Sequence, residues 1–247
     1  MIAPIAAHAE LSVGLSVEQF TWAEKSDSGV QLLRERGPRH VANLEWTNTN
    51  NPDFSCGYIG KWYLGKVDYV GRMQTGTPFT TTTAYDGSSH EFRLNFHSHI
   101  KQHSLDYVAG IGLDTWKRAI NNRPRMNPVE RFELFYLRAG VSIPSGIEPG
   151  LYFSGGLKYP IQITEKVDGP SNGLDSGVTL HPGKEVSYYG EAGYRFYDSS
   201  WRVSLYYEGC RLVRSGNVAA RVGGRPVLVH QPKSDMDMVG IRAVLFY

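Results

Sequence analysis

Hydrophobic and polar residues alternate with a period of two along most of this chain, and a helical period is almost absent. In segment 104–116, for example, Ala109, Ile111 and Leu113 alternate with the small or polar residues Gly110, Gly112 and Asp114. Such alternation indicates β-strands with two unlike faces. Ten segments show it: 10–23, 39–48, 58–70, 89–98, 104–116, 131–143, 150–162, 185–197, 200–212 and 236–247. The pattern therefore predicts an all-β protein of about ten strands.

The first of these segments changes phase partway along. Its apolar residues occupy odd positions up to Val17, and then Phe20 and Trp22 occupy even ones. A β-bulge adds one residue to a strand and moves later side chains to the other face. We therefore expect a bulge near Glu18 or Gln19.

The connections between the expected strands alternate strictly in length. The long ones are 24–38, 71–88, 117–130, 163–184 and 213–235, and the short ones are 49–57, 99–103, 144–149 and 198–199. An even number of antiparallel strands, with long loops at one end and short turns at the other, is typical of transmembrane β-barrels. The sequence thus predicts one up-and-down barrel with long extracellular loops and short periplasmic turns.

The apolar face of the expected strands favours a barrel that faces lipid. It is almost free of charge, and aromatic residues gather near strand ends, as in the interfacial girdles of membrane barrels. We expect these interfacial aromatics to include Trp22, Trp46, Tyr69, Tyr159 and Trp201. A soluble barrel would alternate too, but with its apolar face turned inward.

The last nine residues, Val239–Tyr247, resemble the C-terminal signature of Gram-negative outer-membrane proteins. The final residue is aromatic, and apolar residues occur at alternate positions before it: Ile241, Ala243, Leu245 and Tyr247. The resemblance implies an outer-membrane location with both termini periplasmic. It also implies that the assembly machinery reads this strand, and that outer-membrane lipid and lipopolysaccharide surround the barrel.

The N-terminal residues 1–9 stand apart from the barrel, which we expect to occupy 10–247 as one domain. Ala7-His8-Ala9 fits the small-residue pattern of a signal-peptidase site, although a basic region and a full apolar region are missing. This segment is therefore expected to be a signal-peptide remnant or a flexible N-terminus.

Charge and cysteine content narrow the possible functions. The chain has 26 Lys and Arg against 24 Asp and Glu, a net charge of +2, which gives no reason to expect nucleic acid as a partner. Cys56 and Cys210 lack the spacing of a metal or haem site, so neither a metal nor a cofactor is expected. The two cysteines should also stay unpaired, because they fall near opposite ends of strands that rise roughly 30 Å, beyond the ~7 Å Cα limit of a disulfide.

The polar face of the strands carries acids and bases in nearly equal number. A barrel of about ten strands has little spare interior, and buried charges must be paired. We therefore expect a network of cross-strand ion pairs that closes the lumen, formed by Glu18, Lys66, Asp68, Glu91, Arg93, Lys158, Glu191, Glu208 and Arg242. The expected register sets Lys66 and Asp68 beside Glu91 and Arg93, Lys158 beside Glu191, and Arg242 between Glu208 and Glu18. The alternative is a narrow polar channel.

The long loops contain arginines that could bind the phosphates of lipopolysaccharide, because guanidinium groups match phosphate geometry. The candidates are Arg123, Arg125, Arg221 and Arg225. The apolar run 227–229 in the last loop is a candidate contact for a protein partner.

The sequence matches two enzyme families of outer-membrane barrels only incompletely. Omptin proteases need acidic residues and an Asp-His pair at the rim, and Asp235, Asp237, His181 and His230 do not complete that set. Lipid A deacylases use a His-Ser pair, for which the segment 97–99 is a superficial match at an expected turn. The leading hypothesis is therefore a non-enzymatic structural or interaction protein that acts through its extracellular loops. A narrow porin-like channel comes second, and an outer-membrane protease or lipid A modifying enzyme third.

Overall fold

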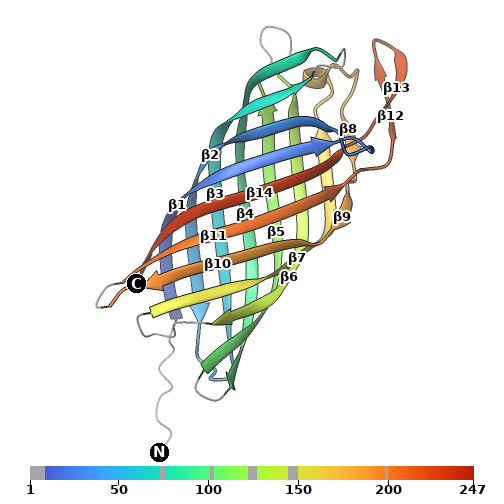
Figure 1. The fold of residues 1–247 in the computed structure, drawn as a ribbon. Helices are drawn as coiled ribbons and strands as arrows, with labels where there is room; N and C mark the ends of the chain where they lie inside the picture. The colour runs from blue at the N-terminus through green and yellow to red at the C-terminus, as the bar shows by residue number, and fades with distance from the viewer. Residues whose placement is uncertain (1–8, 73–75, 101–102, 122–126, 144–149, 198–199) are drawn as a thin grey trace, which may run out of the picture.

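The computed structural model describes residues 9–72, 76–100, 103–121, 127–143, 150–197 and 200–247. Within these residues, ten long antiparallel strands wind round a common axis (Figure 1). They are β1 (Ala9–Lys25), β2 (Gln31–Asn48), β3 (Phe54–Arg72), β4 (Pro78–Ile100), β5 (His103–Ile120), β6 (Val129–Ile143), β7 (Gly150–Val167), β10 (Ser187–Arg195), β11 (Trp201–Val213) and β14 (Lys233–Phe246).

Pairing of the last strand with the first closes the barrel. Each strand from β1 to β7 pairs with the next, β7 pairs with β10, β10 with β11, and β11 with β14. Strand β14 returns to β1, where Val17 lies opposite Ile241 and Ser12 opposite Phe246. The expected closed, up-and-down barrel of ten antiparallel strands is therefore confirmed.

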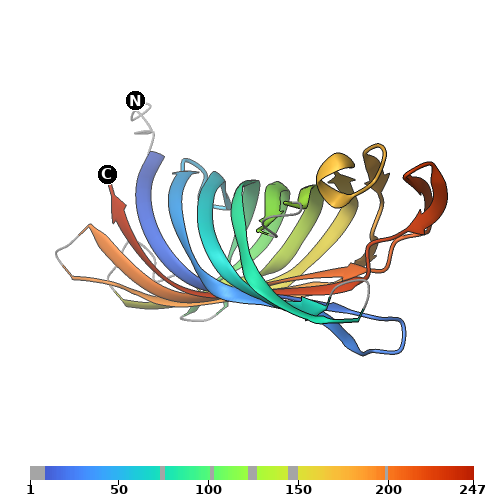
Figure 2. The ribbon, with the colours of Figure 1, turned by 90° about the horizontal axis from the view of Figure 1, so that it is seen from above.

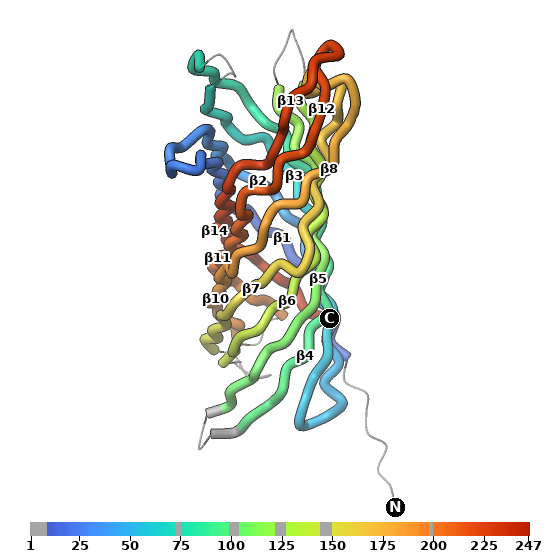
Figure 3. The backbone as a smooth tube through the Cα atoms, turned by 90° about the vertical axis from the view of Figure 1, so that its right-hand side faces the viewer, coloured from blue at the N-terminus to red at the C-terminus, as the bar shows by residue number. Residues whose placement is uncertain are grey.

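Short elements gather at one end of the barrel. They are a 3₁₀-helix (Pro170–Asn172), β8 (Val178–Leu180), β9 (Gly183–Glu185) and the hairpin of β12 (Val218–Val222) and β13 (Arg225–Val229). Figure 3 shows this hairpin at one end, with the chain termini toward the other; we call these the hairpin end and the terminal end. From above, the hairpin projects beyond the wall (Figure 2). In the described residues no helix has the length and apolar character needed to cross a membrane.

Most strands are longer than the sequence pattern suggested. Strands β1 to β7 have between 15 and 23 residues, whereas about 9–11 residues cross a bilayer. Much of segments 24–38 and 71–88, expected to be loops, is strand: β1 and β2 continue to a turn at 26–30, and β4 begins at Pro78. The barrel wall therefore extends well past the apolar band of its outer surface.

The two halves of the barrel have opposite polarity. In the half near the terminal end, apolar residues such as Leu15 and Leu64 face outward and are 72% and 62% exposed. In the half near the hairpin end, the outward residues become polar, and the buried apolar cluster lies inside the barrel. This inversion explains the phase change at Phe20. Strand β1 pairs with β2 without a register shift from Ala9 to Glu24, so the expected bulge near Glu18 is wrong.

Candidate functional site

The lumen holds most of the charged side chains that the strands bury, and its first cluster lies near the terminal end. Arg242 binds Glu45 through Nη1 at 2.8 Å and Glu191 through Nη2 at 3.2 Å. Arg202 donates to the other oxygen of Glu45 at 2.8 Å, and the Tyr152 hydroxyl donates to Glu191 at 2.6 Å. Side chains of the four neighbouring strands β7, β10, β11 and β14 are therefore tied to Glu45 of β2.

A second cluster, farther along the strands, centres on Glu208 of β11. Lys158 Nζ donates to this carboxylate at 2.7 Å, Lys61 Nζ at 3.0 Å and Arg138 at 3.1 Å. Lys158 also binds Asp114 at 2.7 Å. Strands β3, β5, β6, β7 and β11 thus meet at one carboxylate and its cations, which spans the lumen from wall to wall.

Arg138 connects this cluster to Glu91 of β4. Its Nε lies 2.9 Å from Glu91 Oε2, and Arg93 Nη2 lies 2.7 Å from Glu91 Oε1. The Tyr136 hydroxyl donates to the same carboxylate at 3.0 Å. Each of these buried charges therefore has partners of opposite sign, as burial requires.

Glu18 and Arg39 form a third group of buried charges, beside the aromatic part of the interior. Arg39 Nε donates to Glu18 at 2.8 Å, and the Tyr206 hydroxyl donates to the second carboxylate oxygen at 2.7 Å. The Arg39 guanidinium lies between the rings of Phe20 and Tyr63, 4.1 and 4.3 Å from their centroids. Cation–π contact on both faces adds to the ion pair.

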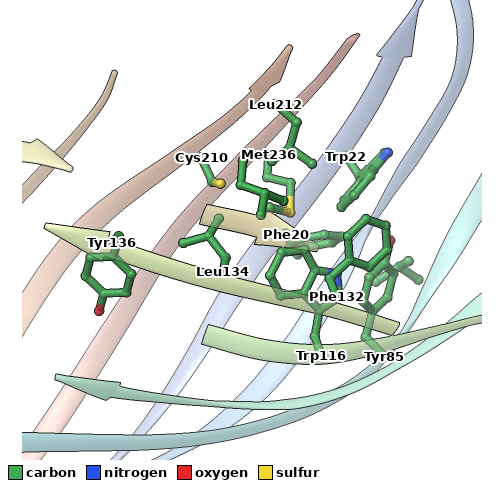
Figure 4. Packing of buried hydrophobic residues seen from close by; sticks show 12 residues of the cluster. Phe20, Trp22, Tyr85, Trp116, Phe132, Leu134, Tyr136, Cys210, Leu212 and Met236 are labelled. Carbon is green, nitrogen blue, oxygen red and sulfur yellow. The ribbon is translucent and has the colours of Figure 1, made fainter. Parts of the chain in front are cut away.

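Toward the hairpin end, aromatic side chains fill the lumen. The rings of Trp116 and Phe132 are stacked with centroids 4.8 Å apart, and Trp22 packs against both. Figure 4 shows these three side chains with those of Phe20 and Tyr85, packed into one cluster inside the barrel. Close packing of this kind leaves little free path along the axis.

Beyond this aromatic cluster, Arg118 of β5 holds three carboxylates. Its guanidinium lies 3.0 Å from Glu24, 2.9 Å from Glu35 and 2.7 Å from Glu130. Glu35 also accepts from Thr83 at 2.8 Å. The hairpin end of the lumen is therefore acidic, because one cation faces three anions.

Two carboxyl groups in this region have raised pKa values. Burial raises the pKa of Glu24, although Arg118 opposes the shift. Burial, reinforced by the charges of Glu130 and Glu24, raises the pKa of Glu165 well above its usual range. In the amide orientation that satisfies both of its polar atoms, the Gln231 nitrogen donates to the two oxygens of Glu165 at 3.1 Å, and its oxygen accepts from the Ser234 hydroxyl at 2.9 Å.

Little space remains among the charged clusters. The cavity lined by Glu18, Arg39, Lys61, Lys158 and Glu208 has a volume of about 50 Å³. Such a volume holds only one or a few water molecules. No group of three or more His, Cys, Asp or Glu side chains in the described part of the chain is placed to hold a metal ion.

The nine residues expected to form the lumen network divide into two groups. Strand pairing and burial turn seven of them inward: Glu18, Glu91, Arg93, Lys158, Glu191, Glu208 and Arg242. Lys66 and Asp68 instead face outward and are exposed, so their assignment to the lumen is wrong. They lie on the part of β3 beyond the apolar band, where outward positions meet water and can carry charge.

The expected pairings within the network also need correction. Lys158 binds Asp114 and Glu208 instead of Glu191, and Arg242 binds Glu45 and Glu191 instead of Glu208 and Glu18. Long side chains cross the lumen to strands that are not neighbours, which a count of residues along adjacent strands does not reveal.

Sequence reasoning missed the cluster around Arg118. Arg118, Glu24, Glu35 and Glu130 fall in segments that were expected to be loops. One signal was present in the sequence. Arg118 continues the alternation of Asp114 and Trp116, which predicts an inward position if β5 extends past residue 116.

The expected interfacial aromatics are also divided. Trp46, Tyr159 and Trp201 face outward and are 38–48% exposed. Trp22 is fully buried in the lumen cluster, and Tyr69 is buried on the inner face of β3, so neither belongs to an interfacial girdle. Both lie in the half of the barrel where polarity is inverted.

The arginines and aspartates that are candidates for loop binding and catalysis lie apart from one another. Arg221 and Arg225 are exposed on the β12–β13 hairpin, whereas Arg123 and Arg125 lie outside the described residues. Asp235 and Asp237 face outward, paired with Lys25 and Arg211.

The candidate catalytic histidines form no ion pair with Asp235 or Asp237 in the part of the chain that the structure describes. His181 and His230 are exposed at the hairpin end. His97 binds Asp106 at 2.8 Å near the terminal end, and the side chain of His99 lies outside the described residues. Cys56 and Cys210 are free, as expected.

A closed antiparallel barrel of ten strands, with an outer apolar band and a charged interior, defines the fold class of outer-membrane β-barrels. Among solved structures, the chain is similar to the outer membrane protease OmpT of Escherichia coli, with a TM-score of 0.61 and 12% sequence identity over 100% of this chain and 98% of that one. This similarity establishes the fold.

Other solved barrels match less well. The translocator domain of the autotransporter NalP from Neisseria meningitidis has a TM-score of 0.44, 13% identity and coverage of 94% of this chain and 87% of that one. The Pseudomonas putida toluene transporter TodX has a TM-score of 0.41, 6% identity and coverage of 96% and 88%. No protein-family model matches the chain. No curated protein matches it either.

Proposed function

We propose that this protein is a non-enzymatic barrel of the Gram-negative outer membrane, with a closed lumen, that acts as a structural or interaction protein through its extracellular end. The observation that carries the proposal is the filling of the lumen by the ion-pair clusters and by the aromatic cluster of Trp22, Trp116 and Phe132. A conducting pore needs a continuous water-filled path, and these side chains occupy it.

The outer surface supports the placement in a membrane. Apolar residues cover the outward face near the terminal end, and outward charge begins beyond them. On this basis we propose that the terminal end lies in the periplasm and the hairpin end outside the cell. The outward positions Ile241, Ala243, Leu245 and Tyr247 on β14 then present the alternating pattern that we propose the assembly machinery recognises.

The hairpin end offers the surface for a partner. Leu228 on β13 is 67% exposed, and Arg221 and Arg225 are exposed on the same hairpin. Exposed apolar residues beside cationic ones suit a protein partner or the phosphates of lipopolysaccharide. In this proposal, specificity comes from the hairpin, while the barrel supplies a rigid anchor.

One pair of assays separates the three functional classes. The protein is reconstituted in liposomes for swelling with small sugars, and the same preparation is incubated with peptides and with lipid A to detect hydrolysis. The proposal predicts no swelling above protein-free liposomes and no hydrolysis. Swelling would establish a channel, and cleavage of either substrate would establish an enzyme; each result would overturn the proposed function.

A further inference from the structure

A long groove crosses the outer wall of the barrel. Its volume is about 1280 Å³, larger than the roughly 300–1,000 Å³ of drug-sized ligand sites. It is lined mainly by outward-facing residues of seven neighbouring strands, from β14 through β1 to β6. One continuous row of cross-strand partners runs along it: Ile241, Val17, His40, Leu64, Asp86, Lys117 and Arg131.

The groove changes character along its length. At the β14–β1 end, Ile241 and Val17 belong to the outward apolar band. At the β5–β6 end, Lys117 and Arg131 lie beyond that band, each four residues past the apolar Leu113 and Phe135 along its strand. Because barrel strands are tilted, a row of paired residues climbs around the wall. The groove therefore runs from the apolar band to the charged surface above it.

The two cations at the charged end lack ion-pair partners. No ion pair within the described ranges joins Lys117 or Arg131 to a carboxylate. Glu133, the neighbouring acid, is bound by Lys166 at 2.6 Å. Asp86 lies opposite Lys117 in register without an ion pair to it. Arg131 is also near enough to Asp168 to lower the pKa of that carboxyl, without an ion pair to it. Two cations without an ion pair at the edge of an apolar surface favour an anionic ligand with an apolar part.

We propose that this wall groove binds a membrane lipid with a phosphate-bearing head group. Its acyl chain lies against Leu15, Val17 and Ile241, and its phosphate lies at Lys117 and Arg131. Asp86, between the two ends, accepts hydrogen bonds from a hydroxyl or amine of the head group. The polarity gradient matches that of a lipid in the outer leaflet, and this match distinguishes a lipid from a protein segment.

The test compares lipid binding by matched double variants of the full-length protein in detergent. K117Q/R131Q removes both groove cations, and R36Q/K66Q removes two exposed outward cations on β2 and β3 outside the groove. The probes are lipid A, dephosphorylated lipid A and inorganic phosphate, measured by native mass spectrometry. We expect K117Q/R131Q to weaken lipid A binding about tenfold or more and R36Q/K66Q to leave it unchanged.

A second variant tests the apolar part independently of charge. Ala42, an exposed residue lining the groove, is replaced by Trp to fill it. Ala42→Trp should reduce lipid A binding while the folded barrel keeps its mobility on an unboiled gel. Equal weakening by both double variants, equal binding of dephosphorylated lipid A, or displacement of lipid A by equimolar phosphate would overturn the proposal. A shift of oligomeric state in Ala42→Trp without loss of lipid would instead assign the groove to a second copy of the chain, and would overturn it too.

Discussion

Arg242 and Lys66 show how position decides what a charged residue contributes to this barrel. The Arg242 guanidinium is buried between Glu45 and Glu191, whereas Lys66 is exposed on the outer wall with no ion pair among the described residues. Removing one member of a buried pair leaves its partner charged and desolvated, while an exposed charge is solvated by water.

Arg242→Met should lower the free energy of unfolding by about 3–5 kcal/mol, because Glu45 and Glu191 lose a shared partner in a closed interior. Lys66→Met, the same change on the outer wall, should change it by less than about 1 kcal/mol. Urea titration in detergent, followed by tryptophan fluorescence, measures both. Similar small losses in the two variants would mean that water screens the lumen charges.

Glu165 makes stability depend on pH. Its pKa is raised in the folded barrel, so the folded state holds a proton that the unfolded chain releases above its ordinary pKa of 4.5. Stability from this group is therefore full below that value and is lost as pH rises through the raised pKa.

Glu165→Gln should therefore raise the melting temperature at pH 8 and flatten its pH dependence, since the amide stays neutral and still reaches Gln231. Glu133→Gln, on the exposed Lys166 pair, serves as the control and should leave the pH profile unchanged. Thermal melts at a series of pH values measure the effect. A wild-type profile retained in Glu165→Gln would show that the group ionises normally.

Among the elements, the β12–β13 hairpin is tied to a neighbouring segment through Asp175, whose backbone N–H donates to the Arg221 carbonyl at 2.8 Å. Its turn, Gly223-Gly224, has positive φ at both residues, which suits glycine in a two-residue hairpin turn. Asp175 accepts from the backbone N–H of both glycines at 2.7 Å. This carboxylate therefore fixes the turn to the segment between β7 and β8.

Asp175→Ala should release the hairpin without weakening the barrel. Trypsin should then cut after Arg221 several times faster, while the melting temperature of the barrel stays within about 2 °C, because the lost bonds are exposed. Asp27→Ala, which removes an exposed carboxylate near Arg214, provides a matched control. Cleavage at the wild-type rate in Asp175→Ala would show that the hairpin is held by other contacts.

The elements also show what the sequence could and could not predict. Alternation located the ten strands and their order around the barrel, because the outward positions are apolar in the part of each strand that belongs to the apolar band. It did not locate their far ends. Past Val17, outward positions meet water, and the inward Phe20 and Trp22 are apolar, so the pattern inverts and was interpreted as a bulge or as loops.

The same inversion limited prediction of the lumen. Charges in the apolar-banded half, such as Glu18 and Arg242, were assigned to the interior by simple alternation, whereas Lys66 was assigned to the wrong face and the Arg118 cluster was missed. Partners across the lumen depend on barrel diameter and side-chain reach, as in the bond from Lys158 to Glu208. The alternation pattern of a single strand gives neither the diameter of the barrel nor the reach of a side chain across it.

At the scale of the whole molecule, two kinds of side-chain packing fill the lumen of the barrel. Ion pairs close the part surrounded by the outer apolar band, and aromatic packing closes the part beyond it. The wall groove, in contrast, lies outside the lumen and spans the boundary between the two halves. We therefore propose that the interior serves stability and that this barrel binds partners on its outer wall or at its hairpin end.

Single-channel recording in planar bilayers tests the closed lumen most directly. Wild type should show no steady conductance above the bare bilayer. A variant with Trp22, Trp116 and Phe132 all replaced by Ala should conduct more, if its barrel stays folded on an unboiled gel, because these side chains fill the lumen of the far half. Steady, ion-selective conductance in wild type, altered by Arg242→Met, would contradict the closed lumen and establish a channel.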